Sequence, residues 1–102
     1  MDFQSEFQRV TDQLRSDWEN YKRYYPDAYD ILNSLVNIST YLKVKPDDYD
    51  VLDRITEYLL SMTADGKLFS SSPICPELRE LLINFDAYIN SRFELGNTEN
   101  QS

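Results

Sequence analysis

Residues 3–25 read FQSEFQRVTDQLRSDWENYKRYY, and this stretch decides the class of fold. Its apolar side chains recur every three or four residues, which places them on one face of an α-helix and the charged side chains on the others. Pro26 follows directly and ends the helix, because proline lacks an amide hydrogen and clashes with the preceding turn. We therefore predict one continuous helix over residues 3–25, with an apolar stripe of Phe3, Phe7, Val10, Leu14, Trp18, Tyr21 and Tyr25.

Three more stripes of the same period follow, each with its own start and stop signals. Pro26 and Pro46 are each followed by aspartate, and both residue types suit the first turn of a helix. Pro46 ends the second helix, and Gly66 and Gly96 end the third and the fourth, since glycine adopts the left-handed cap conformation without strain. The predicted stripes are Ala28, Ile31, Leu32, Leu35, Ile38 and Leu42; Val51, Leu52, Ile55, Tyr58, Leu59 and Met62; and Leu78, Leu81, Leu82, Phe85, Tyr88 and Ile89.

Four amphipathic stripes joined by short connections predict an all-α fold, an antiparallel four-helix bundle. Residues 67–74 read as a loop, because the serines and the proline in this segment favour turns. We expect a single four-helix bundle domain over residues 1–96. Residues 97–102 are polar and lack a stripe, and we expect them to form a disordered C-terminal tail.

The composition of the chain excludes several classes of function. The chain has 102 residues, 10 basic and 18 acidic, so its formal net charge is −8. Such a charge opposes binding to nucleic-acid phosphates, which requires a basic face. The chain contains no histidine and one cysteine, which removes the commonest general base and any internal disulfide. No apolar run is long enough to span a membrane, and the N-terminus does not resemble a secretory signal, so we expect a cytoplasmic protein.

Residue patterns typical of catalysis are weak. Ser70, Ser71 and Ser72 have no histidine to activate them, and turn formation explains them better. Cys75 lies at a helix start, where a thiol pKa can fall, but a small buried residue is the preferred interpretation. The chain has two glycines and no phosphate-binding loop. We expect no enzymatic activity, no cofactor and no metal ion.

The third predicted helix carries most of the excess negative charge. Asp50, Asp53 and Glu57 are spaced three and four residues apart and therefore share one helical face. A solvated face explains such a run best, because acidic side chains stabilise the N-terminal turns of helices. The same face could instead steer the protein toward a basic partner. A protein inhibitor that covers a basic, nucleic-acid-binding surface is therefore an alternative function.

The last loop and the end of the last helix hold more apolar and aromatic side chains than one stripe needs. Tyrosine, phenylalanine and arginine are the residue types that anchor protein interfaces. Either these side chains close the end of the core, or they form a surface that binds a partner. A small regulatory helical dimer formed through the tyrosines near Pro26 or through this end is a further alternative. The candidate partner-binding residues are Lys67, Leu68, Phe69, Tyr88, Arg92, Phe93 and Leu95.

Three stretches resemble the immunity proteins of the enterocin A type, which protect producers of pediocin-like (class IIa) bacteriocins. Residues 26–32 open the second helix as PDAYDIL, and residues 52–60 read LDRITEYLL in the third. GKLF follows at residues 66–69, and residues 77–85 open the fourth helix as ELRELLINF. Helix number, order and chain length are similar too, and the likeness covers roughly residues 26–95.

The resemblance implies a fold and a function. It implies a cytoplasmic four-helix bundle without enzymatic activity, which protects the producing cell from inside. The bacteriocin engages the membrane components of the mannose phosphotransferase system, and the immunity protein then associates with that assembly. The C-terminal half of the family determines which bacteriocin is resisted, which by position points to the same seven residues. The net charge of −8 disfavours contact with anionic lipid. We therefore expect a monomer or weak dimer that reaches the membrane only through a protein receptor.

Overall fold

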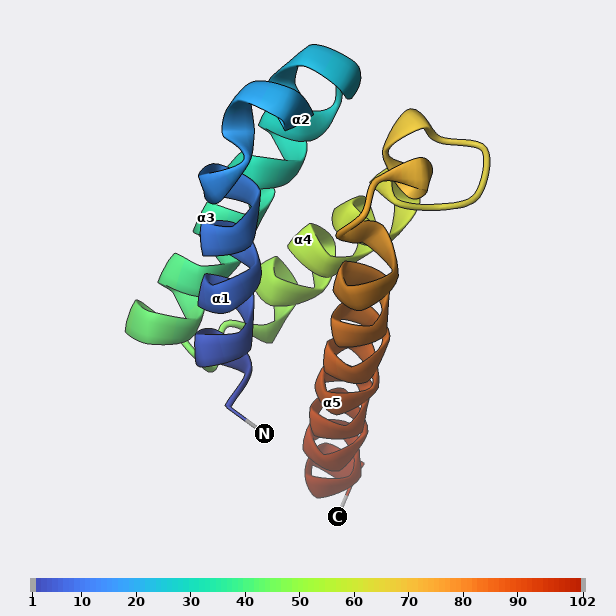
Figure 1. The fold of residues 1–102 in the computed structure, drawn as a ribbon. Coiled ribbons are helices and arrows are strands. Elements are labelled where there is room, and N and C mark those ends of the chain that lie inside the picture. The colour runs from blue at the N-terminus through green and yellow to red at the C-terminus, as the bar shows by residue number, and fades with distance from the viewer. Residues whose placement is uncertain (1, 102) are drawn as a thin grey trace.

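The computed structural model describes the backbone of residues 2–101 and the side chains of residues 2–93. Over the described backbone the protein is all-helical and contains no strand, as predicted. Figure 1 shows the helices, with the start of α1 and the end of α5 toward the same end of the molecule. The elements are α1 (Phe3–Ser16), α2 (Trp18–Tyr24), α3 (Ala28–Val44), α4 (Tyr49–Met62), the 3-10 turn η1 (Leu68–Ser71) and α5 (Cys75–Gln101).

The prediction of one continuous helix over residues 3–25 is wrong at Asp17, where the chain leaves helical geometry at φ −119° and ψ 30°. The Asp17 side chain accepts a hydrogen bond of 2.8 Å from the Asn20 amide, three residues into the next helix. Short polar side chains compete for local hydrogen bonds in this way and favour helix ends over helix interiors. The apolar stripe continues across the break, which is why its period alone did not reveal a bend.

The ends of the later helices differ from the predicted ones in two places. α4 ends at Met62, and Gly66 lies in the turn beyond it with φ at +91°. The left-handed conformation of Gly66 was expected, but as the cap that directly ends the helix, whereas the helix ends at Met62. α5 continues past Gly96 to Gln101, because one glycine inside a helix costs only about 1 kcal/mol and no proline follows. The expected tail over residues 97–102 falls where side chains are not described.

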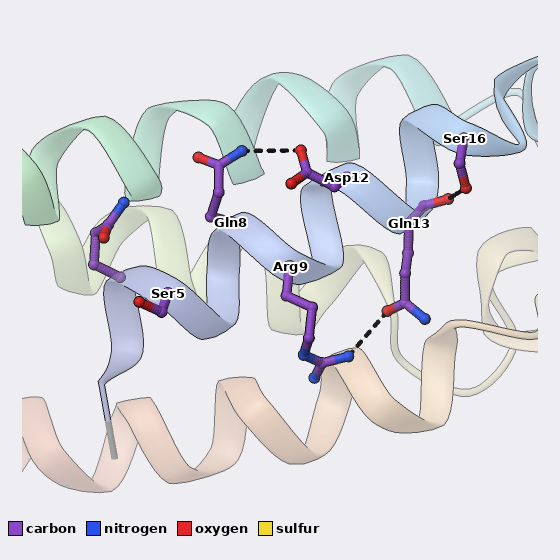
Figure 2. Close-up of a pocket in the computed structure, with 7 residues that line it drawn as sticks. Ser5, Gln8, Arg9, Asp12, Gln13 and Ser16 are labelled. Atoms are coloured by element: carbon purple, nitrogen blue, oxygen red, sulfur yellow. Dashed lines mark hydrogen bonds between the residues drawn. The ribbon is translucent and has the colours of Figure 1, made fainter.

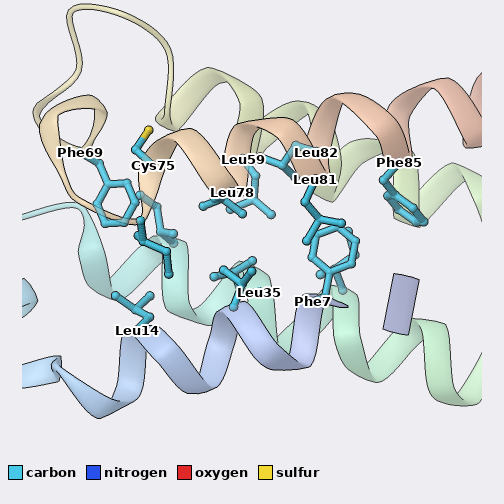
Figure 3. Packing of buried hydrophobic residues seen from close by; sticks show 14 of the residues in the cluster. Phe7, Leu14, Leu35, Leu59, Phe69, Cys75, Leu78, Leu81, Leu82 and Phe85 are labelled. Carbon is cyan, nitrogen blue, oxygen red and sulfur yellow. The ribbon is translucent and has the colours of Figure 1, made fainter. Parts of the chain in front are cut away.

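The core lies between the helices and is built mainly from the predicted stripes, to which the loop adds Phe69 and Ile74. Tyr58, which we expected on the third stripe, is instead 42% exposed. Figure 3 shows Phe7 and Leu14 of α1 facing Leu78 and Phe85 of α5, with side chains of α3 and α4 between them. The Phe7 and Phe85 rings meet edge to face with centroids 5.1 Å apart. The largest fully buried side chains are Phe7, Phe69, Phe85, Leu14, Ile31, Leu35, Ile38, Leu52, Leu59, Leu78, Leu82 and Ile89.

The pairs of helices pack against each other to different extents. α1 packs closely along α3, α4 packs along α5, and α3 contacts α4, whereas α1 and α5 approach each other at few points. In Figure 1, α1 and α3 run side by side in opposite directions, and α5 descends on the other side of α4. Arg9 of α1 bridges the open seam with ion pairs to Glu6 on its own helix and to Glu77 on α5.

Candidate functional site

The last loop exposes one of its two large apolar side chains and buries the other. Leu68 is 60% exposed, whereas Phe69 is fully buried. The Phe69 ring lies 5.9 Å from the Tyr21 ring and 5.7 Å from the Tyr25 ring, centroid to centroid. Phe69, which we expected at the partner surface, therefore closes the end of the core, because η1 folds it under the loop. Lys67 and Leu68 remain on the surface.

The second half of the predicted surface lies far down α5. The Arg92 guanidinium lies over the Tyr88 ring, 5.1 Å from its centroid. The Tyr88 ring also packs against Phe3 of α1 at 5.3 Å. Phe93 is half-buried against Tyr49 of α4, with ring centroids 6.1 Å apart. The side chain of Leu95 lies outside the described residues.

The structure does not bring the two halves of this surface together. Leu68 lies beside the start of α5, and Tyr88 lies 13 residues after the first residue of that helix. At 1.5 Å per residue, the two positions are roughly 20 Å apart along the helix axis. The candidate residues therefore form two surfaces, a loop surface (Lys67 and Leu68) and an α5 surface (Tyr88, Arg92 and Phe93).

Sequence reasoning missed Tyr49 as part of the α5 surface. Partial burial, and then the neighbouring Tyr88 hydroxyl, raise the pKa of the Tyr49 phenol above its ordinary value of 10.0. Tyr49 opens α4, and Tyr88 and Phe93 lie late in α5, so the contact follows from the antiparallel course of these two helices. A search for aromatic residues at the opposite ends of paired helices would have found it.

The acidic face extends beyond the helix from which it was predicted. Carboxylate oxygens of Asp53 and Glu57 on α4 and of Asp86 on α5 lie within 4.8 Å of one another. Asp50 lies outside this group. One Asp86 oxygen is buried and has no hydrogen-bond partner among the residues whose side chains are described, and the other accepts from the Asn90 amide at 3.4 Å. Three carboxylates of this kind could supply part of an oxygen-ligand set for a hard divalent cation.

The groups considered for nucleophilic chemistry are held in structural roles. Burial raises the pKa of the Cys75 thiol above its ordinary value of 9.0, which is the opposite of what a reactive thiolate needs. The thiol lies 3.6 Å from the Thr63 carbonyl oxygen. Ser70 and Ser71 donate hydrogen bonds back to carbonyl oxygens of their own turn. The Ser72 hydroxyl is buried and finds no hydrogen-bond partner within residues 2–93.

The end of α4 is held by a side chain of α5. The Arg79 guanidinium donates to the Leu60 carbonyl oxygen and to the Thr63 hydroxyl, both at 3.1 Å. These groups lie at the C-terminal end of α4, where carbonyl oxygens lack helical partners and a positive charge is favoured. Arg79 therefore fixes the position of the turn that leads to the loop surface.

A shallow polar hollow runs along the outer side of α1 (Figure 2). Within it the Gln8 amide donates to Asp12 at 3.0 Å, and Arg9 donates to Gln13 at 3.1 Å. Figure 2 also shows that Arg9 points toward α5. All the lining side chains come from one helix, so the hollow cannot enclose a substrate. They are Gln4, Ser5, Gln8, Arg9, Asp12, Gln13 and Ser16.

None of the helices over residues 2–101 combines the length and the apolar character that crossing a lipid bilayer requires.

Comparison with protein-family models, curated proteins and solved structures finds no match to this chain.

Proposed function

We propose that the protein is a bacteriocin immunity protein that protects a producing cell from a pediocin-like bacteriocin. It acts from the cytoplasmic side, where it binds the membrane receptor of the mannose phosphotransferase type once the bacteriocin has engaged it. The proposal rests on the likeness of residues 26–95 to immunity proteins of the enterocin A type. Surface recognition is the activity in this proposal, and no reaction is catalysed.

The structural observation that supports the proposal is the exposure of Lys67, Leu68 and Arg92 in the C-terminal half of the chain. Leu68 is 60% exposed on the rigid turn η1, which Phe69 anchors in the core. Further along α5, the Arg92 guanidinium lies over the Tyr88 ring, and Arg92 is exposed. Aromatic and arginine side chains on rigid elements are typical of interface anchors.

We propose further that α1 and α2 act as one bent rod, so that the architecture is an antiparallel four-helix bundle. Asp17 is the single residue between α1 and α2, and its carbonyl oxygen accepts the Tyr21 amide at 3.1 Å. The core stripe runs through both helices, from Phe7 to Tyr21. Both helices would therefore pack as one layer beside α3.

The direct test is protection of a sensitive lactic acid bacterium. The protein is expressed in the cytoplasm, and the cells are challenged with a panel of pediocin-like bacteriocins. We expect an increase of at least about tenfold in the inhibitory concentration of one or a few of them. Unchanged killing across the whole panel, with the protein soluble in the cells, would contradict the proposal.

Two variants then show which surface recognises the target. Leu68→Asp alters the loop surface, and Arg92→Glu alters the α5 surface. Tyr29→Asp is the matched control, because Tyr29 is 64% exposed on α3, outside both surfaces. We expect protection to fall with at least one of the first two variants and to persist with the third. Equal loss in all three would show that neither surface recognises the target.

The carboxylate group on α4 and α5 favours a second candidate function, an acidic inhibitor that covers a basic surface of a nucleic-acid-binding partner. No cation of the described residues forms an ion pair with Asp53, Glu57 or Asp86. Binding of this kind weakens steeply with added salt. Reversing Asp50, Asp53 and Glu57 to lysine should abolish inhibition. Undiminished inhibition by that variant would rule this candidate out.

A further inference from the structure

A small polar hollow of about 70 Å³ lies between α1 and α3. Its floor is formed by buried polar side chains, since Thr11 is 1% exposed and Ser39 is 5% exposed. The Ser39 hydroxyl donates to the Gln8 amide oxygen at 3.1 Å and so links the two helices. Because these hydroxyl side chains are small, the closely packed helices leave a space between them. The lining residues are Gln8, Thr11, Arg15, Val36, Ser39, Thr40 and Lys43.

Two basic side chains line the hollow, and the seven residues described around it include no acidic one. Arg15 comes from the last turn of α1 and Lys43 from the last turn of α3. The two helices run in opposite directions, and long side chains lean toward the N-terminal end of their own helix. Arg15 and Lys43 therefore approach the hollow from its two ends.

These two cations are available to a ligand. Neither forms an ion pair with a side chain in residues 2–93, whereas Arg9 and Lys22 do. Arg15, Lys43 and Thr40 are exposed, so the hollow is reached from solvent past them. A guanidinium and an ammonium group form strong, charge-assisted hydrogen bonds to the oxygens of an anion. The hydroxyls of Thr40 and Ser39 can turn their hydrogens toward the same oxygens.

The charge at the hollow differs in sign from that of the whole chain, which is −8. Asp12 contacts one of the lining residues, because its carboxylate accepts from the Gln8 amide at 3.0 Å. Two cations at the hollow itself outweigh this one carboxylate. Exposed charges more than about 8 Å away are largely screened at physiological salt. The local field therefore favours a small anion, although the net charge of the protein opposes a large one.

We propose that the hollow between α1 and α3 binds a small, doubly charged oxyanion, either inorganic phosphate or the phosphoryl group of a small molecule. Arg15 and Lys43 supply the charge, and the hydroxyls of Ser39 and Thr40 supply further donors. Pockets that enclose a drug-sized ligand measure roughly 300–1,000 Å³, so this hollow accommodates a phosphoryl group and not a whole nucleotide. The inference goes beyond the immunity function and does not depend on it, because it uses neither the loop surface nor the α5 surface.

The test is a titration of the full chain, followed by amide shifts in NMR spectra. The probe is inorganic phosphate at about pH 7.5, where a phosphoryl group carries nearly two charges. Sodium chloride keeps the ionic strength constant and is titrated alone as the control. We expect saturable shifts that cluster in residues 8–15 and 36–43 with phosphate and not with chloride. Glycerol phosphate is the second probe: shifts at the same residues identify a phosphoryl group as the ligand, and their absence identifies the free ion.

A pair of double variants locates the site. Arg15→Gln with Lys43→Gln removes both cations of the hollow, and Arg23→Gln with Arg54→Gln removes two exposed cations of α2 and α4. Each pair removes two positive charges, so both proteins have a net charge of −8 − 2 = −10. We expect the first pair to weaken phosphate binding at least about tenfold, because charge-assisted hydrogen bonds are lost. The second pair should weaken it less than about threefold.

Three results would overturn the proposal. They are equal weakening by the two double variants, shifts that chloride reproduces, and shifts that do not saturate or that spread over the exposed cations of the whole chain. Circular dichroism verifies that each variant is helical. If the variant without Arg15 and Lys43 does not fold, the shifts of the unaltered protein decide, because they depend on no substitution.

Discussion

Phe69 and Leu68 are neighbours in sequence with opposite environments, and the difference decides what each can do. Phe69 is fully buried between the Tyr21 and Tyr25 rings, whereas Leu68 is 60% exposed. Both residues were candidates for partner binding on the strength of residue type alone. Loop sequence without periodicity does not show which of two adjacent apolar side chains points inward, since the direction depends on how η1 packs on the rest of the protein.

Substitutions at these two positions should separate stability from recognition. Phe69→Ala removes a ring from a closed core and should lower the free energy of unfolding by about 3–5 kcal/mol. Leu68→Ala should change it by less than about 0.5 kcal/mol, because the side chain is mostly in solvent. Urea unfolding followed by Trp18 fluorescence measures both. A similar loss for the two variants would contradict the assigned environments.

Gly66 is needed for its backbone conformation and not for lack of space. Its φ is +91°, and a Cβ built there would meet no atom within 4 Å. Gly66→Ala should therefore lower the free energy of unfolding by about 1–2 kcal/mol through backbone strain alone. Gly66→Asn should lower it less, since asparagine tolerates the left-handed region better. Thermal unfolding of both variants provides the measurement, and an alanine variant as stable as the parent would refute this account.

At the level of the elements, the all-helical class and the order of the amphipathic segments could be predicted. The number of helices could not, since four were expected and the described residues form five α-helices, and neither could their exact ends. The three-and-four spacing of apolar residues placed the buried faces of α1, α3, α4 and α5. One member of the predicted α4 stripe was wrong, because Tyr58 is 42% exposed. The break in the first helix at Asp17 was not predicted, because the apolar stripe continues through it. The separation of the two surfaces was not predicted either, because residue types alone do not show that Leu68 of η1 lies before the start of α5 while Tyr88 lies 13 residues into that helix.

Arg79 of α5 links that helix to α4, and replacing it should destabilise the C-terminal end of α4. Arg79→Met keeps the apolar stem but removes the hydrogen bonds to the Leu60 carbonyl and the Thr63 hydroxyl. We expect the free energy of unfolding to fall by about 1–2 kcal/mol. The control Arg54→Met, at an exposed position of α4, should change it by less than about 0.5 kcal/mol. Equal effects in chemical denaturation would show that Arg79 does not hold this helix end.

For the whole molecule, excess negative charge is a source of instability that one substitution can relieve. Asp53, Glu57 and Asp86 hold their carboxylates within 4.8 Å of one another. Asp86→Asn should raise the free energy of unfolding by about 0.5–1 kcal/mol at low salt, and the gain should shrink as salt screens the repulsion. Asp65→Asn, at an exposed turn, is the control and should have a smaller effect. A loss of stability in Asp86→Asn would contradict this prediction, because it would show that favourable contacts of the Asp86 carboxylate outweigh the repulsion among the three carboxylates.

Alkaline pH should weaken the fold. Burial raises the pKa of the Cys75 thiol above 9.0 and that of the Tyr21 phenol above 10.0. Above pH 9 the unfolded chain therefore releases these protons before the folded chain does, and stability falls as pH rises. Urea unfolding between pH 7 and pH 11 should show this decline, and Cys75→Ala should make its first part shallower. Stability that rises over this range would contradict the environments given to both groups.

The central claim about the whole molecule is that it recognises a membrane receptor only after a bacteriocin has engaged it. The most direct measurement is co-purification of the protein with a tagged membrane component of the mannose phosphotransferase system, from cells treated or not treated with the bacteriocin that it resists. We predict association in treated cells and little or none in untreated cells. No association in either condition, or equal association in both, would contradict the claim.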